Sequence, residues 1–331
     1  MARSHPSGSL TAKTHPSGSL SAKTHPDGSL AAKTHPAGSL MARTSPEKVG
    51  GRAEEQGDQF KELLESSDAL VAWWSPNGES AGNLADGDIA MKSMFGTNPS
   101  MKIKTASAGN WKIVEDNPGG DGAPDTLKSA VAASTQAKTD YCALDNAVSL
   151  STDLAAVLND SPHDTSISGF VFFKMNDTSP DFNFQDILQF SGLVNTGTGS
   201  DNANTMFLGT WTGDDVYIGG IKQNVGQMTT SVVHSVWYYL AFFTDGVNAT
   251  AYQVKADGSE DWGDVVTMTH TSNGSYLPRD GLSMGRNSSH GAQSNDALQW
   301  GPIGLFNTGV GVGEEGATLR TIFERAISYL G

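Results

Sequence analysis

The stretch VWYYLAFFTDG, residues 236–246, decides the fold. Its first eight residues are apolar or aromatic, and the Asp245-Gly246 step that follows is a strong signal for a tight hairpin turn. The next stretch, Val247–Lys255, is again rich in residues that favour strands. These residues predict two antiparallel strands joined by a turn. Eight apolar residues are far fewer than the roughly 20 that a bilayer-spanning helix needs, so no membrane insertion is expected.

Similar short stretches recur on both sides of this hairpin, between clusters of Gly, Asn, Asp and Ser. No helical periodicity separates them, which predicts an all-β fold, an antiparallel sandwich. The nine expected strands are Ile167–Met175, Phe184–Phe190, Thr205–Trp211, Asp215–Ile221, Val236–Thr244, Val247–Lys255, Asp264–His270, Gly281–Arg286 and Gln299–Phe306.

One helix is predicted, at the C-terminal end of the sequence. Its acidic start is favourable for a helix N-terminus, and its apolar residues share one face, so it should cover part of the sandwich. The acidic residues are Glu314 and Glu315, and the apolar ones are Leu319, Ile322, Phe323, Ala326, Ile327 and Leu330.

Charge divides the chain into a basic arm and an acidic body. The 331 residues include 21 Lys plus Arg and 36 Asp plus Glu, for a net charge of -15, and 37% are hydrophobic. Residues 1–52 hold seven basic and two acidic residues, a charge of +5, which leaves -20 for the rest. This strongly acidic body argues against general nucleic-acid binding, which needs a basic face. The chain has one cysteine, Cys142, and can therefore form no internal disulfide. Because no apolar signal segment follows Met1, we expect synthesis in a cytoplasm.

The arm is a decapeptide repeat: ARSHPSGSLT, AKTHPSGSLS, AKTHPDGSLA, AKTHPAGSLM and a decayed fifth copy, ARTSPEKVGG. In each His-Pro-x-Gly, Pro and Gly occupy the second and fourth positions of a four-residue turn, where a type I turn favours them. The Leu and Ala that follow lie two residues apart, as on one face of a strand. One copy buries too little to offset its ordering entropy, so the copies should be ordered only by stacking on one another or on a partner. The alternative is a disordered basic tail.

The histidines of the repeat allow two interpretations. They can be part of the His-Pro turns, or they can bind metal ions or act as a pH switch. Their place in the turns is sufficient to explain them. We take the His-Pro pairs as the attachment residues of the arm: His5, Pro6, His15, Pro16, His25, Pro26, His35 and Pro36.

A short helical neck is expected between the arm and the body. Phe60, Leu63 and Leu64 lie three and four residues apart, as on one helical face, and can pack on the body or on symmetry mates. The chain is therefore predicted to have an attachment arm (residues 1–52), a neck (residues 53–67) and a sandwich (residues 68–331).

Four motifs of the body resemble the concanavalin A-like lectin/glucanase superfamily, in the laminin-G-like form found as a terminal domain of bacteriophage fibres and other virion appendages. The resemblance implies that the predicted sandwich is a jelly roll of the concanavalin A-like kind. LVAWWS (70–75) resembles the first strand, and residues 236–246 resemble the central Trp strand with its hairpin. LSMGR (282–286) resembles a late strand, and GPIGLFN (301–307) with the last helix resembles the end of the domain. Residues 78–140 fit poorly and are expected to hold insertions.

The resemblance does not extend to catalytic residues. Enzymes of the superfamily carry a Glu-x-Asp-x-x-Glu run on one strand, and this chain has none. The nearest cluster, EDWGD at residues 260–264, falls in a predicted loop. No Gly-x-Ser-x-Gly elbow and no phosphate-binding Gly loop is present, so the protein is expected not to be an enzyme.

Members of this family often bind sugars or calcium at the loop rim, which implies Ca²⁺ as the candidate cofactor here. Each candidate also has an ordinary interpretation, as a solvated turn or a core tryptophan, and Trp73 and Trp237 are assigned to the core. The candidate carbohydrate-binding residues are Trp211, Asp215, Asp245, Trp262, Asn287 and Asp296, with Asp214 and Trp300 considered beside them.

Arm and body together suggest a bacteriophage virion structural protein, assembled in the host cytoplasm. The expected form is a tail fibre or adhesion protein that binds other virion proteins through residues 1–52 and a host surface glycan through the body. A weak likeness of the arm to the shaft repeats of trimeric viral fibres implies a homotrimer. The alternatives are a capsid decoration or head fibre protein, and a free carbohydrate-binding or glycan-cleaving protein.

Overall fold

The structure is a computed structural model, and it divides the chain into two units, residues 1–52 and 53–331. In the first unit it describes residues 10–13, 21–24, 30–33 and 41–44. In the second it describes residues 61–76, 82–104, 111–114, 116, 126–129, 141–159, 165–175, 185–190, 206–211, 215–220, 223–271, 281–285, 298–307 and 319–324. No helix within these ranges is long and apolar enough to cross a membrane.

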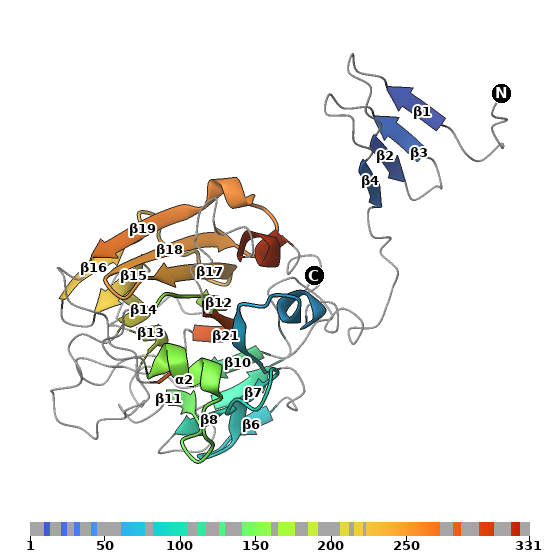
Figure 1. Cartoon of the computed structure of the whole chain (residues 1–331). Coiled ribbons are helices and arrows are strands. Elements are labelled where there is room, and N and C mark those ends of the chain that lie inside the picture. Colours follow the sequence, from blue (N-terminus) through green and yellow to red (C-terminus); the bar gives the residue numbers. More distant parts are fainter. Residues whose placement is uncertain are drawn as a thin grey trace. The chain divides into compact units, whose positions relative to one another are not determined.

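The first unit is a four-stranded sheet to which each of the four intact repeats contributes one strand. The order across the sheet is β1-β3-β2-β4, with β1 parallel to β3, β3 antiparallel to β2, and β2 parallel to β4 (Figure 1). The copies stack on one another, as the repeat predicts. The strands are β1 (Leu10–Lys13), β2 (Ser21–Thr24), β3 (Leu30–Lys33) and β4 (Met41–Thr44). The predicted attachment residues, from His5 and Pro6 to His35 and Pro36, lie outside the described residues.

The second unit is an antiparallel sandwich, which confirms the all-β, jelly-roll-like prediction. In the first sheet, β19 (Val266–Thr271), β18 (Asn248–Lys255), β17 (Trp237–Thr244), β12 (Ile167–Met175) and β21 (Leu298–Phe306) pair in that order. The other edge of β21 pairs with β5 (Leu70–Ser75) and β10 (Thr126–Ser129), and β9 (Trp111–Val114) and β6 (Gly82–Leu84) continue from β10. Figure 1 shows β17, β18 and β19 lying side by side.

The second sheet begins at β7 (Ile89–Ser93), which pairs with β5 of the first sheet and with β8 of the second. It continues through β8 (Met101–Lys104), β11 (Tyr141–Leu144), β20 (Ser283–Met284), β13 (Gln185–Gln189), β14 (Met206–Trp211), β15 (Asp215–Gly220) and β16 (Gln223–Gln227).

All nine expected strands are confirmed, with ends shifted by a few residues, and the rest of the body contains strands and a helix that the sequence analysis did not predict. The poorly fitting stretch from residue 78 to 140 contributes β6 to β10, of which β8 alternates apolar and Lys residues. A helix, α2 (Thr152–Leu158), also lies among the strands. Ser151 caps it by accepting from the Leu154 N–H at 3.2 Å, and Leu154, Val157 and Leu158 are buried, so the capping and spacing signals were present.

Two apolar layers cover the two faces of the first sheet. Along β12, Val171 and Phe173 face the core between the sheets, while Phe170 and Phe172 belong to a second cluster on the outer face. Successive strand residues point to opposite faces, so a strand covered on both sides is buried throughout, as all nine residues of β12 are.

Two helical segments cover part of the outer face. Residues 61–65 place Leu64 in the second cluster, and residues 319–324 place Leu319, Ile322 and Phe323 there. The predicted helix on the sandwich is confirmed for these residues, and the neck packs on the body. Ala326, Ile327 and Leu330 lie outside the described residues.

Candidate functional site

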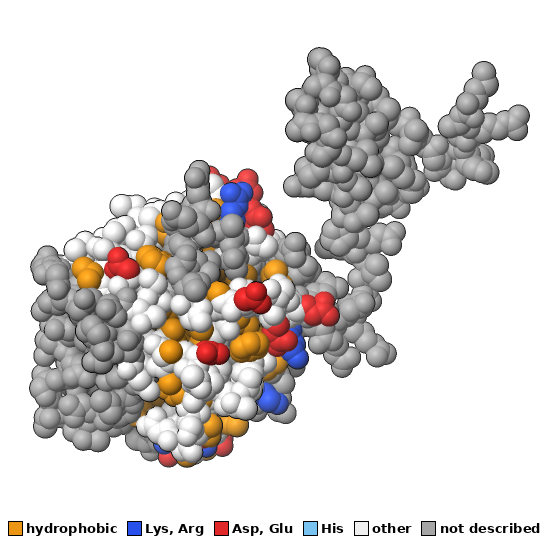
Figure 2. Space-filling view, in the orientation of Figure 1, with side chains coloured by type: hydrophobic (Ala, Val, Ile, Leu, Met, Phe, Trp, Pro, Cys, Tyr) orange, Lys and Arg blue, Asp and Glu red, His pale blue; other side chains and the backbone are white. Residues whose placement is uncertain are grey.

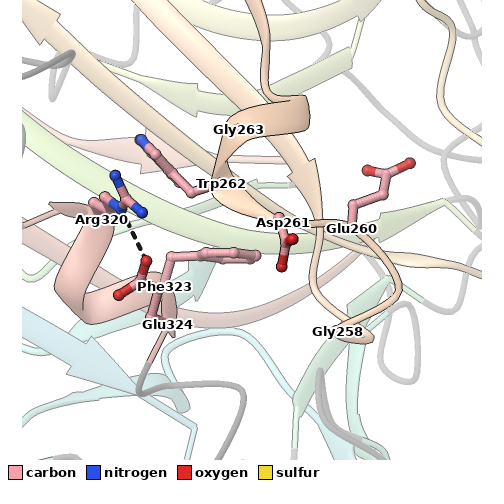
Figure 3. A pocket seen from close by; sticks show the side chains of 8 residues that line it. All are labelled: Gly258, Glu260, Asp261, Trp262, Gly263, Arg320, Phe323 and Glu324. Carbon is pink, nitrogen blue, oxygen red and sulfur yellow. Dashed lines mark hydrogen bonds and ion pairs between the residues drawn. The ribbon is translucent and has the colours of Figure 1, made fainter. Parts of the chain in front are cut away.

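A cleft of about 510 Å³ lies between the terminal helix and the loop that follows β18. Figure 3 shows its two sides, with the side chains of the loop facing those of the terminal helix. The lining residues are Gly258, Glu260, Asp261, Trp262 and Gly263 from the loop, and Arg320, Phe323 and Glu324 from the helix. Two segments more than 50 residues apart in the sequence therefore form one concave site.

The loop side is held by its own polar contacts. Glu260 accepts from the Lys255 backbone N–H at 3.0 Å and pairs with Lys255 Nζ at 2.9 Å. This hydrogen bond and charge raise the pKa of Lys255 above its ordinary value. Asp257 accepts from the backbone and the hydroxyl of Ser259, and these bonds outweigh burial, so the pKa of Asp257 is lowered. Gly258 turns the chain at φ 73°, where a side chain would be strained.

The helix side is anchored to the sheet by one buried hydrogen bond. The Tyr239 hydroxyl on β17 donates to the Leu319 carbonyl at 3.0 Å. Burial raises the pKa of Tyr239 well above its ordinary value, so this donor stays protonated. On the same helix, Arg320 Nε donates to Glu324 Oε1 at 2.8 Å, four residues on, and both side chains are about half exposed.

Trp262 links the two sides of the cleft. It lies in the short 3₁₀ helix η1 (Trp262–Asp264), and its ring stacks on Tyr252, with centroids 6.0 Å apart and planes 14° apart. Phe323 of the terminal helix contacts the same ring at 5.7 Å. Trp262 is only partly buried, so it supports the second cluster and also lines the cleft.

The charged groups of the cleft are predominantly acidic. Of its three carboxylates, Glu260 is paired with Lys255 and Glu324 with Arg320, which leaves Asp261 without an ion pair among the residues that the structure describes. Carboxylates accept hydrogen bonds from hydroxyl groups, the guanidinium donates them, and an aromatic ring packs on an apolar sugar face. The arrangement can therefore hold a polyhydroxylated ligand and disfavours an anionic one.

The predicted residues at the β14–β15 hairpin lie in the second sheet. Trp211 and Asp215 are directly opposite each other in the register. The Asp215 carboxylate accepts from Gln227 Nε2 at 2.5 Å and from Ser231 Oγ at 2.6 Å. Both of its oxygens therefore already join this hairpin to the chain that follows it.

Asp245 holds the β17–β18 turn. Its carboxylate accepts from the backbone N–H groups of Val247 and Asn248 and from Asn248 Nδ2, at 2.6–2.9 Å. Burial opposes ionisation of Asp245, but these bonds outweigh it and lower its pKa. Asp245 lies next to the start of β18 and Trp262 beyond its end. Because the eight residues of β18 span about 23 Å, the two residues do not share a site.

Trp300, considered beside them as a platform, is fully buried. It stacks on Trp111 with centroids 5.6 Å apart and donates from Nε1 to the Ile187 carbonyl, so the platform interpretation is wrong. Trp73 and Trp237 are buried, as predicted. Asp214, Asn287 and Asp296 lie outside the described residues.

The described carboxylates do not fit a calcium ion. Ca²⁺ requires six to eight oxygen ligands, whereas Asp215 and Asp245 are each surrounded by N–H and O–H donors. In the part of the chain that the structure describes, no three His, Cys, Asp or Glu residues are grouped so that they could hold a metal ion.

A polar cluster that the sequence did not suggest lies on the outer face of the first sheet. Trp237, Lys174 and Gln299 are cross-strand neighbours on β17, β12 and β21. Asp116, after β9, is ion-paired with Lys174 and accepts from Gln299 Nε2 at 3.0 Å and Trp237 Nε1 at 3.2 Å. The Lys174 ammonium also lies 5.1 Å from the centroid of a Trp237 ring. These contacts fasten the segment after β9 to the sheet.

The face drawn in Figure 2 shows acidic and basic side chains scattered among hydrophobic ones over the described surface.

No family model and no curated protein matches this chain. Among solved structures it is similar to Trypanosoma rangeli sialidase in complex with 2,3-difluorosialic acid, at 12% identity and a TM-score of 0.48, over 82% of this chain and 37% of that one. It is also similar to the binding domain of botulinum neurotoxin DC in complex with SialylT, at 9% identity and a TM-score of 0.46, over 78% and 51%. The chain thus spans about half or less of these proteins.

The paired strands, rather than these distant likenesses, define the class of protein. Two antiparallel sheets enclose one core, and helical segments cover a second apolar face. The body is an all-β sandwich of jelly-roll type with an open cleft on its helix-covered side.

Proposed function

We propose that the body binds a carbohydrate in the cleft between the 258–264 loop and the terminal helix, without cleaving it. One observation carries this proposal. A partly exposed Trp262 ring, three carboxylates and one guanidinium line a single cleft of about 510 Å³. Pockets that hold small ligands combine an aromatic surface with a few polar groups that fix orientation.

The charge of the cleft points to neutral or amino sugars. Three carboxylates line the cleft, and Lys255 and Arg320 pair with two of them, Glu260 and Glu324, so one negative charge remains and a sialylated ligand would add another. A glycan array carrying neutral and sialylated oligosaccharides tests this directly. We expect binding to neutral members and weaker binding to sialylated ones, and a preference for sialylated members would contradict the assignment.

A matched pair of variants tests the location of the site. Arg320→Ala/Glu324→Ala removes the ion pair at the cleft, whereas Lys61→Ala/Glu65→Ala removes another i,i+4 pair from the helical segment at residues 61–65. We expect the first variant to lose at least tenfold in affinity for the array hit by calorimetry, and the second to bind like wild type. Equal affinity in all three proteins would exclude the cleft.

The absence of catalysis needs its own measurement. The proposal rests on the lack of a Glu-x-Asp-x-x-Glu run on one strand. We expect no reducing sugar to be released from polysaccharides that contain the bound unit. Its release would favour the alternative, a free glycan-cleaving protein.

We further propose that the chain is a bacteriophage virion structural protein, a tail fibre or adhesion protein that belongs to the concanavalin A-like lectins. The repeat arm supports this, because four near-identical copies suit attachment to a repetitive particle better than they suit a free enzyme. In this proposal residues 1–52 bind other virion proteins and the chain forms a homotrimer. Immunogold labelling of the particle tests it: label on the tail is expected, label on the head would favour a capsid decoration or head fibre protein, and no label would contradict both.

A further inference from the structure

The sheet of the arm follows a regular order of strand directions. Its three contacts are parallel, antiparallel and parallel in sequence across the sheet. One alanine from each repeat stands in a single row across the four strands, because Ala12 pairs with Ala32, Ala32 with Ala22, and Ala22 with Ala42. The strands of different repeats are thus interchangeable partners.

Each outer strand of this sheet has one edge with no partner among the described residues. There, β1 pairs with β3 alone and β4 with β2 alone. An edge strand presents a row of N–H and C=O groups that can pair with another strand. The two edge strands run in opposite directions. β1 is parallel to β3 and β4 is parallel to β2, whereas β3 and β2 are antiparallel.

The edge of β4 fits the edge of β1 in a second copy of the chain. Contacts across the sheet alternate between parallel and antiparallel, so the contact that would continue this alternation beyond β4 is antiparallel. With Ala42 opposite Ala12 it would set Thr44 against Leu10, repeating the contact in which Ala22 opposes Ala32 and Thr24 opposes Leu30. The chain already contains this pairing, between the same positions of two repeats.

Charge favours the same antiparallel register. Inside the sheet, the parallel contacts set Lys13 beside Lys33 and Lys23 beside Arg43. The antiparallel contact instead sets Lys23 against Ala31. Like charges directly opposite each other are destabilising in sheets, so a further contact is better made antiparallel, with basic residues facing neutral ones.

We propose that copies of this chain join head to tail through antiparallel pairing of β4 in one copy with β1 in the next, with Ala42 opposite Ala12. Two different edges meet, so the contact is heterologous and can close into a ring. The inference deepens the trimer of the proposed function by naming the strands that join the copies, and it does not depend on glycan binding.

Cysteine cross-linking of the full-length chain tests the pairing. Ala12→Cys and Ala42→Cys are made as separate variants, coexpressed and oxidised with diamide. We expect a disulfide-linked species of twice the chain mass when both variants are present, and none from either variant alone. Directly opposed strand residues are close enough for a disulfide, and the native Cys142 is buried. Wild type treated in the same way is the control for Cys142.

An internal control shows whether the sheet has formed. In the double variant Ala22→Cys/Ala32→Cys, the two cysteines are opposed within one chain, so oxidation should consume both thiols without doubling the mass. Linked dimers from Ala12→Cys alone or Ala42→Cys alone would overturn the head-to-tail pairing in favour of like edges meeting. No linked species in the mixture would overturn the proposal, whether or not the control forms. Glycan binding of these variants is measured separately, so failure of the pairing is distinguishable from failure of the cleft.

Discussion

Gly285 is a single position where any side chain would disturb the core. Its φ is +68°, and a Cβ there would lie 2.4 Å from Trp111 Cη2 and 3.0 Å from Trp300 Cη2. Those two indoles stack on each other and are fully buried, so neither has room to move. The glycine is therefore required by both backbone conformation and space.

We predict that Gly285→Ala lowers the free energy of unfolding by about 1–3 kcal/mol, because it combines backbone strain with overpacking. Urea unfolding followed by tryptophan fluorescence measures the change. Gly263→Ala is the matched control, since a Cβ at Gly263 would meet no atom within 4 Å. Equal stability of the two variants would show that the Trp111–Trp300 stack can yield.

Asp116 gives the stability of the body a specific pH dependence. Burial alone would raise the pKa of Asp116, but hydrogen bonds from Lys174 and Trp237 and the charge of Lys174 outweigh it and lower the pKa below 3.8. A carboxyl whose pKa is lower in the folded state stabilises the fold above its unfolded pKa, and this contribution is lost as the pH falls through the folded pKa.

Asp116→Asn should therefore cost about 1 kcal/mol at pH 7, the size of a charge-assisted hydrogen bond that is partly exposed. The difference from wild type should shrink as the pH falls below about 4. Unfolding curves at both pH values measure it, with the exposed Asp68→Asn as control. A difference that stays constant with pH would mean that the charge of Asp116 contributes nothing.

At the scale of elements, the terminal helix depends on one strand for its position. Its buried residues pack in the second cluster, and Tyr239 of β17 fixes its first turn through the Leu319 carbonyl. The cleft exists only while this helix is docked, because three of its lining residues come from it.

Tyr239→Phe should destabilise the body by about 1 kcal/mol and increase amide exchange in residues 319–324, because it removes a buried hydrogen bond between the sheet and the first turn of the helix. Hydrogen exchange with mass spectrometry gives the readout. Tyr238→Phe is the control, since the Tyr238 hydroxyl accepts from Val233 N–H instead. Unchanged exchange in residues 319–324 of Tyr239→Phe would show that packing alone holds the helix.

At the scale of the whole molecule, the arm and the body should differ sharply in stability. The body buries two apolar clusters, whereas the strands of the arm are four residues long and centred on alanine. Ordering costs about 1–2 kcal/mol per residue, which so small a sheet does not offset without further partners.

We therefore predict that arm amides at residues 10–44 are protected from exchange only in the assembled state. Sedimentation should give a mass near three times 34.8 kDa at micromolar concentration, and dilution to a monomer should release protection in the arm and leave the body unchanged. Strong protection of the arm in a monomer, or a mass near 34.8 kDa at micromolar concentration, would contradict this.

Local patterns predicted much of the body and part of the site. The β17–β18 hairpin followed from an apolar run and an Asp-Gly step, and Asp245 does hold that turn. The interpretation failed where burial had to be known. Trp300 was considered as an exposed platform, but it is packed on Trp111 from a distant strand. Likewise Lys174 is an ordinary lysine in sequence, and its partner Asp116 is 58 residues away.

What the sequence determined by itself was local: the period-two strands, the turns, the helical face of Leu319, Ile322 and Phe323, and the ten-residue repeat of the arm. These depend on the conformations of a few neighbouring residues. Tertiary structure alone decided which distant segments meet. The outer face of the first sheet needed an apolar cover, and the same docking that buried Phe323 against Tyr239 brought Arg320 and Glu324 to the loop of Trp262.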